Sequence, residues 1–423
     1  MGDYNAIRAG TDLSAYAREL ARTHEKVLAG GHPSLRPRAL VSRSWQRVLD
    51  FGLDPDDTNN RDPLGIEDVL RRRESSPLRL VIDDLIAVVR SIADASQLLM
   101  VVTDADGVIL WREGSSAVRR RADRLGFGEG ARWTEAMVGT NAIGTALAEA
   151  APVQLFSAEH FEANQHPWYC TAAPIHDPRT GELLGIVDVS GPALTLHPAI
   201  GALVETGVRL AESTLWRRHE QRLARLRRAA APLLATLDGP MLLVDEHGWV
   251  AHNSGIAVRE RIAAPRAERA LTVPGLGLCL PEPLGEGWLI RGAAAGPGVV
   301  ATLELTRTPT LRVSAAGRSW RSTVTARHAE ILILLRAAGP AGRTAGRLSR
   351  DLYGDAEHVV AVRAEVSRLR RDLGALVDTR PYRLAEGVTL TLDPGEAGSL
   401  AEAAFLSAAR SPGVRAAAAG TAA

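Results

Sequence analysis

Hydrophobic residues recur at helical spacing in the first part of the chain. Between residues 39 and 49 the apolar positions lie three or four residues apart, and Gly52 and Pro55 follow as helix-ending residues. The surrounding positions are mostly polar. Residues 1–78 are therefore predicted to form a helical leader.

After this leader the pattern changes to short apolar runs. The runs 98–103 and 108–111 flank an Asp-Ala-Asp-Gly turn signal, and this arrangement predicts a β-hairpin. A further apolar run, 183–189, follows a turn-forming Asp-Pro-Arg-Thr-Gly segment. Residues 79–215 are thus predicted to form an α+β domain with an antiparallel sheet.

Apolar residues at heptad-like spacing continue between positions 204 and 226, with arginines on the other faces. The pattern predicts a connecting helix that includes residues 216–236. It is compatible with an amphipathic helix packed on its own domain and with a parallel dimer stalk between domains. We expect a homodimer, and the oligomeric state distinguishes the two arrangements.

Short strands return in residues 237–309. The segments 241–244 and 249–251 flank an Asp-Glu-His-Gly turn, and 299–305 reads as a later strand. The region is predicted to be a second, small α+β unit. The stretch 242–253 resembles the first hairpin of a PAS-type sensor fold.

Three helices are predicted near the C-terminus. Thr325 and Thr344 stand at the N-cap positions of the first two, and Gly354 ends the second. The third, residues 357–373, has one stripe of apolar residues and an opposite face rich in arginine. Two further runs between 379 and 392 are predicted to form a hairpin.

The arginine-rich face can present guanidinium groups to guanine edges and phosphates in the major groove of DNA. For an isolated helix, a solvated charged face is the alternative. Here the helix stands within a longer pattern, because two helices precede it and a hairpin follows.

The segments 348–353, 362–374 and 379–384 resemble the OmpR-type winged helix. The resemblance implies a winged helix-turn-helix domain over residues 318–393, in which Pro381 replaces the glycine that the family usually has in its wing. The residues expected to contact DNA are Arg363, Ala364, Ser367, Arg368, Arg370, Arg371, Thr379, Arg380, Tyr382 and Arg383.

Several motifs stand in order between residues 35 and 215. They are Ser-Trp-Gln-Arg at 44–47, Val-Gly-Thr-Asn-Ala-Ile-Gly-Thr-Ala-Leu at 138–147, Glu-His-Phe at 159–161 and Trp-Tyr-Cys-Thr-Ala-Ala-Pro-Ile-His-Asp-Pro at 168–178. Together they resemble the GAF sensor domain of bacterial activators of acetoin and glycerol metabolism. The residues that could line a small-molecule pocket are Trp133, Thr140, Asn141, Thr145, His160, His166, Trp168 and Cys170.

Each of these residues also has a structural alternative. Asn141 can cap the following helix, the tryptophans can be core residues, and His160 and His166 can lie at the surface. Cys170 is expected to be an inert small hydrophobe and not a redox sensor. Because the His and Cys spacings match no tight ligand pair, we expect no metal and no other cofactor.

Composition limits the possible classes of protein. With 46% hydrophobic and 23% charged residues, the chain is neither fibrous nor wholly disordered. Fifty basic and 49 acidic residues give a net charge of +1, so any contact with nucleic acid must come from a local basic face. The start lacks the pattern of a signal peptide and no run of about 18 apolar residues occurs, so we expect a cytoplasmic protein without a membrane span.

Relatives with this GAF segment usually continue into an ATPase domain that drives the alternative sigma factor. Such a domain needs a glycine-rich loop that ends in lysine, and Lys26 is the one lysine of the sequence. ATP-driven activation is therefore not expected. The Ala-rich segment 394–423 is predicted to be a disordered tail.

The combined prediction is a multidomain α+β protein that acts as a one-component transcription regulator. Its expected partners are duplex DNA, an unidentified small-molecule effector and a second copy of the chain. A protein-interaction adaptor with a degenerate winged helix is the alternative. A GAF-fold redox enzyme using Cys170 is disfavoured, because Cys279 lies in another predicted unit and no nucleophile-elbow pattern occurs.

Overall fold

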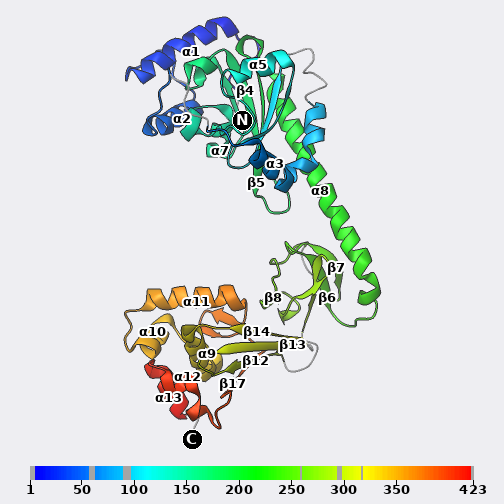
Figure 1. Cartoon of the computed structure of the whole chain (residues 1–423), viewed down its shortest axis with the longest axis vertical. Coiled ribbons are helices and arrows are strands. Elements are labelled where there is room, and N and C mark those ends of the chain that lie inside the picture. The colour runs from blue at the N-terminus through cyan, green and yellow to red at the C-terminus, as the bar shows by residue number, and fades with distance from the viewer. Residues whose placement is uncertain are drawn as a thin grey trace. The chain divides into compact units, whose positions relative to one another are not determined.

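The structure is a computed structural model in two compact units, residues 1–219 and 220–423 (Figure 1). The residues that it describes are 5–56, 62–88, 97–257, 260–292, 298–315 and 318–420.

Three helices precede the sheet of the first unit. They are α1 (Leu13–Leu28), α2 (Ala39–Asp50) and α3 (Ile66–Ser75), followed by the 3-10 turn η1 (Pro77–Leu80). The prediction of helices here is confirmed, but they are not a separate leader. Trp45 and Val48 of α2 lie in the same core as Leu99 and Val101 of the sheet, so the apolar stripe of α2 is buried against the sheet.

The sheet of the first unit has five antiparallel strands in the order β2-β1-β5-β4-β3. The strands are β1 (Leu99–Thr103), β2 (Ile109–Gly114), β3 (Val153–Phe156), β4 (Trp168–His176) and β5 (Leu183–Pro192). The β1–β2 hairpin is confirmed, and its turn is held by Asp104, whose Oδ1 accepts from the Asp106 and Val108 N–H groups at 3.0 Å each. Alternate residues of β1 enter two different cores, so both faces of the sheet are covered.

Short helices between β2 and β3 cover one of these faces. They are α5 (Ser116–Asp123), α6 (Glu135–Val138) and α7 (Ala142–Glu149), and the 3-10 turns η2 (Ser157–Glu159), η3 (Ala163–Gln165) and η4 (Ala193–Thr195) lie farther along the chain. Gly139, between α6 and α7, has a φ of +77°, and a Cβ there would lie 2.6 Å from the Phe161 ring. The close approach of this loop to Phe161 therefore requires glycine.

Helix α8 (Ala199–Leu234) is 36 residues long and begins well before the predicted connector. Val204, Val208 and Leu215 pack in a core of the first unit, whereas Leu226 packs with Leu243 in the second. The apolar positions of the heptad-like pattern are thus buried within the chain. This packing favours the amphipathic helix over the dimer stalk.

The second unit begins with the end of α8, and six strands follow it. They are β6 (Met241–Asp245), β7 (Val250–Ser254), β8 (Leu271–Val273), β9 (Gly277–Cys279), β10 (Glu282–Leu284) and β11 (Gly287–Arg291). They form a sheet in the order β10-β11-β6-β7 and a β8–β9 hairpin around a small core. The α+β, PAS-like prediction needs correction, because the described part of 241–291 contains no helix and the end of α8 packs on it instead.

A second sheet of this unit has the order β14-β13-β12-β17, with β12 and β17 parallel. Its strands are β12 (Val299–Glu304), β13 (Thr310–Ala315), β14 (Arg318–Thr323) and β17 (Val388–Asp393). Two assignments are corrected here. Strand β12 does not belong with the PAS-like strands, and β17 does not pair within the hairpin, because Leu303 and Leu390 share the core of this sheet.

Three helices and a hairpin lie between β14 and β17 (Figure 1). They are α9 (Ala326–Ala338), with the 3-10 turn η5 (Gly339–Ala341), α10 (Ala345–Tyr353), α11 (Val359–Leu373), and the strands β15 (Val377–Thr379) and β16 (Tyr382–Leu384). The predicted caps are confirmed. Thr325 Oγ1 accepts from the His328 N–H at 3.1 Å, and Thr344 Oγ1 accepts from the Arg347 N–H at 3.2 Å.

The C-terminal segment is folded, contrary to the prediction of a disordered tail. It forms η6 (Leu400–Glu402), α12 (Ala404–Ala408) and α13 (Pro412–Gly420). Phe405, Leu406 and Val414 are buried in the same core as α9 to α11, and Ser411 Oγ donates to Glu330 Oε1 at 2.6 Å. A few apolar side chains among many alanines are enough to anchor the segment, because alanine is a strong helix former.

Candidate functional site

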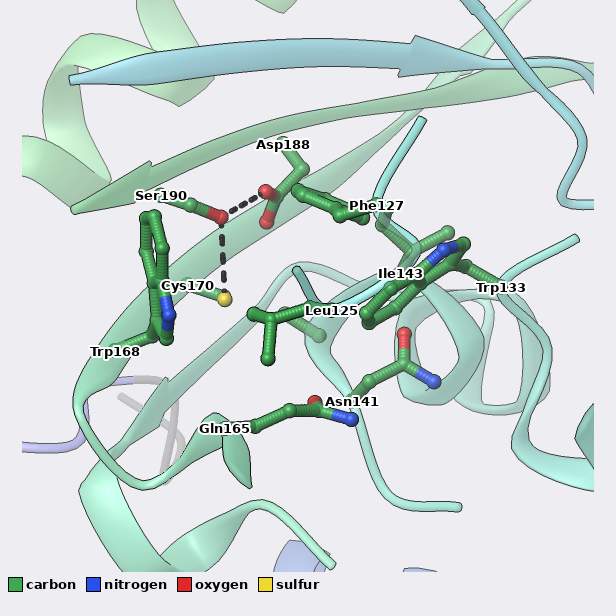
Figure 2. Close-up of a pocket in the computed structure, with 11 residues that line it drawn as sticks. Leu125, Phe127, Trp133, Asn141, Ile143, Gln165, Trp168, Cys170, Asp188 and Ser190 are labelled. Atoms are coloured by element: carbon green, nitrogen blue, oxygen red, sulfur yellow. Dashed lines mark hydrogen bonds between the residues drawn. The ribbon is translucent and has the colours of Figure 1, made fainter. Parts of the chain in front are cut away.

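A pocket lies beside β4 and β5, next to the start of α7 (Figure 2). The space in it that a water molecule can enter is about 20 Å³, roughly the room for a single water molecule, so a larger ligand requires the walls to move apart. The residues that line it are Leu125, Phe127, Trp133, Asn141, Ala142, Ile143, Gln165, Trp168, Cys170, Asp188 and Ser190. Four of the eight residues predicted from the sequence are among them: Trp133, Asn141, Trp168 and Cys170.

Aromatic side chains in defined orientations form part of the wall. The Phe127 and Trp133 rings meet edge to face with centroids 4.3 Å apart, and Trp133 Nε1 donates to the Gly126 carbonyl at 3.4 Å. The guanidinium group of Arg121 lies 4.8 Å from the centre of the Trp168 ring. These contacts hold the rings in place.

A buried polar group closes the pocket at the sheet (Figure 2). Ser190 Oγ lies 2.5 Å from Asp188 Oδ2 and 3.1 Å from Cys170 Sγ. Burial raises the pKa of Asp188 to about 7 and the pKa of the Cys170 thiol well above its usual value. A protonated thiol can donate to Ser190 Oγ, which in turn donates to Asp188.

Asp188 is the side chain in this group with unused hydrogen-bonding capacity. Its Oδ1 is buried and has no partner among the described residues, although the carboxyl group lines the pocket. Such an atom can accept a hydrogen bond from a ligand when the carboxyl is ionised, or donate one when it is protonated. Sequence analysis missed Asp188 and Ser190, and the signal for them was a polar pair inside the apolar run of β5.

Asn141 serves two purposes. Its Oδ1 accepts from the Gly144 N–H at 2.9 Å and caps α7, and its Nδ2 donates to the Gly139 carbonyl at 2.9 Å. The capping alternative therefore holds, while the side chain also lines the pocket. Gln165 on the same wall donates from Nε2 to Glu162 Oε2 at 2.7 Å.

Thr140 and Thr145 do not line the pocket. Ser44 Oγ lies 2.7 Å from Thr140 Oγ1 and 3.3 Å from Thr145 Oγ1, and it donates to Glu135 Oε1 at 2.5 Å. Arg47 donates to both oxygens of Glu135 at 2.7 and 2.9 Å. The Ser-Trp-Gln-Arg motif thus attaches α2 to the segment that carries α6 and α7.

His160 and His166 do not line the pocket, and His160 is buried, not exposed at the surface. His160 is fully buried, with Nδ1 2.9 Å from the Ser157 carbonyl oxygen, and the His166 ring packs against His24 with centroids 4.9 Å apart. Burial lowers the pKa of His160 to about 4 and that of His166 to about 3. Both rings are therefore neutral at physiological pH.

Helix α11 has one buried and one exposed side. Its apolar stripe is buried in the core, and most of the residues predicted to contact DNA point outward. Arg363, Ser367, Arg368, Arg370 and Arg371 are exposed, and Ala364 is half-buried.

The arginines of this face differ in whether they contact a carboxylate. Arg368 Nη2 donates to Glu365 Oε1 at 2.5 Å, and this contact lowers the pKa of Glu365. Arg371 lies 3.9 Å from Asp372. Within the part of the chain that the structure describes, Arg363 and Arg370 have no carboxylate partner.

The β15–β16 hairpin follows α11 directly. Thr379 and Arg380 at its turn are exposed, and the Arg380–Pro381 bond is cis. Tyr382 is half-buried and its N–H donates to the Arg343 carbonyl at 3.0 Å, while Arg383 Nε lies 3.2 Å from Asp378. Arg380 is therefore the most accessible cation of the hairpin.

Two kinds of feature are absent from the described ranges. No helix in them is long and apolar enough to cross a membrane. They also contain no group of three or more His, Cys, Asp or Glu side chains arranged to hold a metal ion.

Comparison with known proteins places these features in a family. Residues 17–210 match the family described as MimR, N-terminal domain. The "Uncharacterized 47.3 kDa protein in thcA 5'region" of Rhodococcus erythropolis is 31% identical over 97% of this chain and 81% of its own length. The acetoin dehydrogenase operon transcriptional activator AcoR of Bacillus subtilis is 45% identical over 24% of this chain and 17% of its own length.

The propane 2-monooxygenase operon transcriptional activator MimR of Mycolicibacterium smegmatis is 30% identical over 44% of this chain and 31% of its own length. The matched part thus spans a third or less of either activator. The chain belongs to the family of the Rhodococcus protein, and its residues 17–210 are similar to the N-terminal domain of MimR.

Proposed function

We propose that this protein is a one-component transcription regulator, in which the pocket of the first unit binds a small effector and α11 binds duplex DNA. The observation that carries the proposal is the exposed arginine-rich face of α11 opposite its buried apolar stripe. The relatives named as transcriptional activators support it.

The elements around α11 support a winged helix. Two capped helices precede α11, the β15–β16 hairpin follows it, and a four-stranded sheet shares their core. In such a domain α11 would enter the major groove, while Arg380 in the wing would reach the backbone beside it. Arg363 and Arg370, which are free of carboxylates in the described structure, are the best placed to neutralise phosphates.

The lining of the pocket indicates the kind of effector. Aromatic and aliphatic side chains form most of it, and Asp188 and Ser190 are its buried polar group. We expect a small, uncharged effector, because no basic side chain is among the lining residues to neutralise a buried anion. The walls would move apart to admit it, since the space open to water is about 20 Å³. Binding of effector and DNA would then be coupled, with each changing the affinity for the other by the same factor.

DNA binding is tested with the full-length protein on a duplex from its own upstream region and on an unrelated duplex of equal length. Replacing both Arg363 and Arg370 by Ala should weaken binding and reduce the salt dependence by about one counterion for each phosphate that is no longer neutralised. Arg119→Ala, an exposed arginine on α5, is the control. Equal, salt-independent binding by all three proteins would support the adaptor alternative.

We further propose that the protein acts in the cytoplasm as a homodimer on paired half-sites about one helical turn apart. Because the heptad-spaced apolar positions of α8 are buried within the chain, we expect that this stripe does not form the dimer contact. Sedimentation with and without DNA measures the oligomeric state, and a monomer on a single half-site would contradict this arrangement.

A further inference from the structure

Val360 is the most exposed large hydrophobic side chain in the described part of the chain, with 78% of its surface accessible. It lies in the first turn of α11, directly after Val359. The core of the unit is built from the opposite side of the helix, by residues such as Val362 and Val366. Val360 therefore contributes little to folding.

The neighbours of Val360 on the helix surface are small or basic. Ala364, Ser367 and Arg371 follow it at intervals of four, seven and eleven residues, which places them in one row along the exposed face. Ala364 and Ser367 are short enough to let another surface approach the helix closely. Arg363 stands beside this row and is exposed.

We infer that Val360 reads a base, by packing against the C5 methyl group of a thymine in the major groove. The inference rests on the proposed DNA binding by α11. Residues near the N-terminus of a recognition helix reach the base edges, and the thymine methyl is the apolar group that the major groove presents.

The charges around Val360 favour DNA over a protein as the occupant of this face. A protein partner would need a wider apolar patch, whereas the row beyond Val360 turns polar at Ser367 and basic at Arg371. Arg363 and Arg370 stand seven residues apart on the same flank of the helix, where phosphates of one strand would neutralise them while the two small residues and Val360 face the bases. Ala364, half-buried one turn along, would limit how deep the helix enters.

The test first selects duplexes that bind the full-length protein from a pool with a randomised core. Each thymine in the selected site is then replaced by deoxyuridine, which lacks only the methyl group. At one position we expect this change to weaken binding of the unmodified protein about fourfold, the value for one buried methyl-sized group. The Val360→Ser variant should bind the thymine duplex with a similar loss and should not distinguish thymine from deoxyuridine there.

Ile66→Ser is the matched control, because Ile66 is an exposed aliphatic residue of α3 in the first unit. It should discriminate thymine from deoxyuridine as the unmodified protein does. The inference is overturned if no thymine position responds to loss of the methyl group, or if Val360→Ser keeps full discrimination. Failure of the proposed function looks different, since the unmodified protein would then select no sequence and show no salt-dependent binding.

Discussion

Replacing Asp188 by Asn tests the assignment of a buried carboxyl group in the pocket whose pKa is raised to about 7. The two side chains have nearly the same shape, and the amide oxygen of the variant could still accept from Ser190. The change removes the ionisation of a group whose pKa burial raises from 3.8 to about 7. Asp188 in the folded state therefore holds a proton that the unfolded chain has already lost at pH 5 to 7.

The linkage between proton binding and folding sets the sign of the effect. Since the folded state binds more protons than the unfolded state in this range, the contribution of Asp188 to stability is full below pH 4 and is lost as the pH rises toward 7. At about 1.4 kcal/mol for each tenfold change in proton affinity, the loss between pH 5 and pH 7 is about 2 kcal/mol. Asp188→Asn does not undergo this loss.

Urea unfolding, followed by tryptophan fluorescence at pH 5, 6, 7 and 8, measures the difference in free energy of unfolding between the variant and the unmodified protein. We expect the variant to gain stability relative to the unmodified protein up to pH 7, with little further change above it. Asp238→Asn, at an exposed aspartate, is the control variant. A difference for Asp188→Asn that stays constant from pH 5 to 8 would refute the buried carboxyl.

Two further predictions concern the buried histidines and the C-terminal segment. Because burial lowers the pKa of His160 to about 4 and that of His166 to about 3, the unfolded chain protonates first below pH 6.5, and the first unit should lose about 1.5 kcal/mol for each histidine between pH 6.5 and 5. In the Asp188→Asn variant this loss can be measured without the opposing effect of Asp188. A free energy of unfolding that stays constant between pH 6.5 and 5 in that variant would contradict the prediction. Deletion of residues 404–423 removes Phe405, Leu406 and Val414 from the core, and each lost side chain lowers the free energy of unfolding by about 1.5 to 3 kcal/mol. We expect this deletion to abolish folding of the second unit, as measured by circular dichroism, and deletion of residues 421–423 to leave it folded.

Local patterns predicted many elements of this fold. Thr325 and Thr344 cap the helices that the sequence assigned to them, and Asp104 closes the predicted turn between β1 and β2. These features depend on a few neighbouring residues, so short-range hydrogen bonding is enough to specify them. Trp168 stands in one of the motifs that resemble the GAF sensor domain, and it lines the pocket as predicted, as does Trp133.

Contacts between distant segments were not predictable in this way. Strand β12 reads like any short apolar strand, and only its parallel pairing with β17 shows to which sheet it belongs. Thr140 and Thr145 stand in the same motif as Asn141, yet they bond to Ser44 on α2 and not to the pocket. An apolar or polar pattern tells which side of an element is buried, but not against what.

Sequence patterns alone were enough to assign several of the helices and strands, the family that the N-terminal part resembles and the basic face of α11. The meeting of Asp188 and Ser190 with Cys170 at the pocket, and the burial of the Ala-rich C-terminal segment in a core, became visible only in the folded chain. The difference lies in how far apart in the sequence the interacting residues are, because caps, turns and amphipathic stripes follow from neighbouring residues. The burial that raises a pKa or anchors a helix depends on surfaces that come together only when the chain has folded.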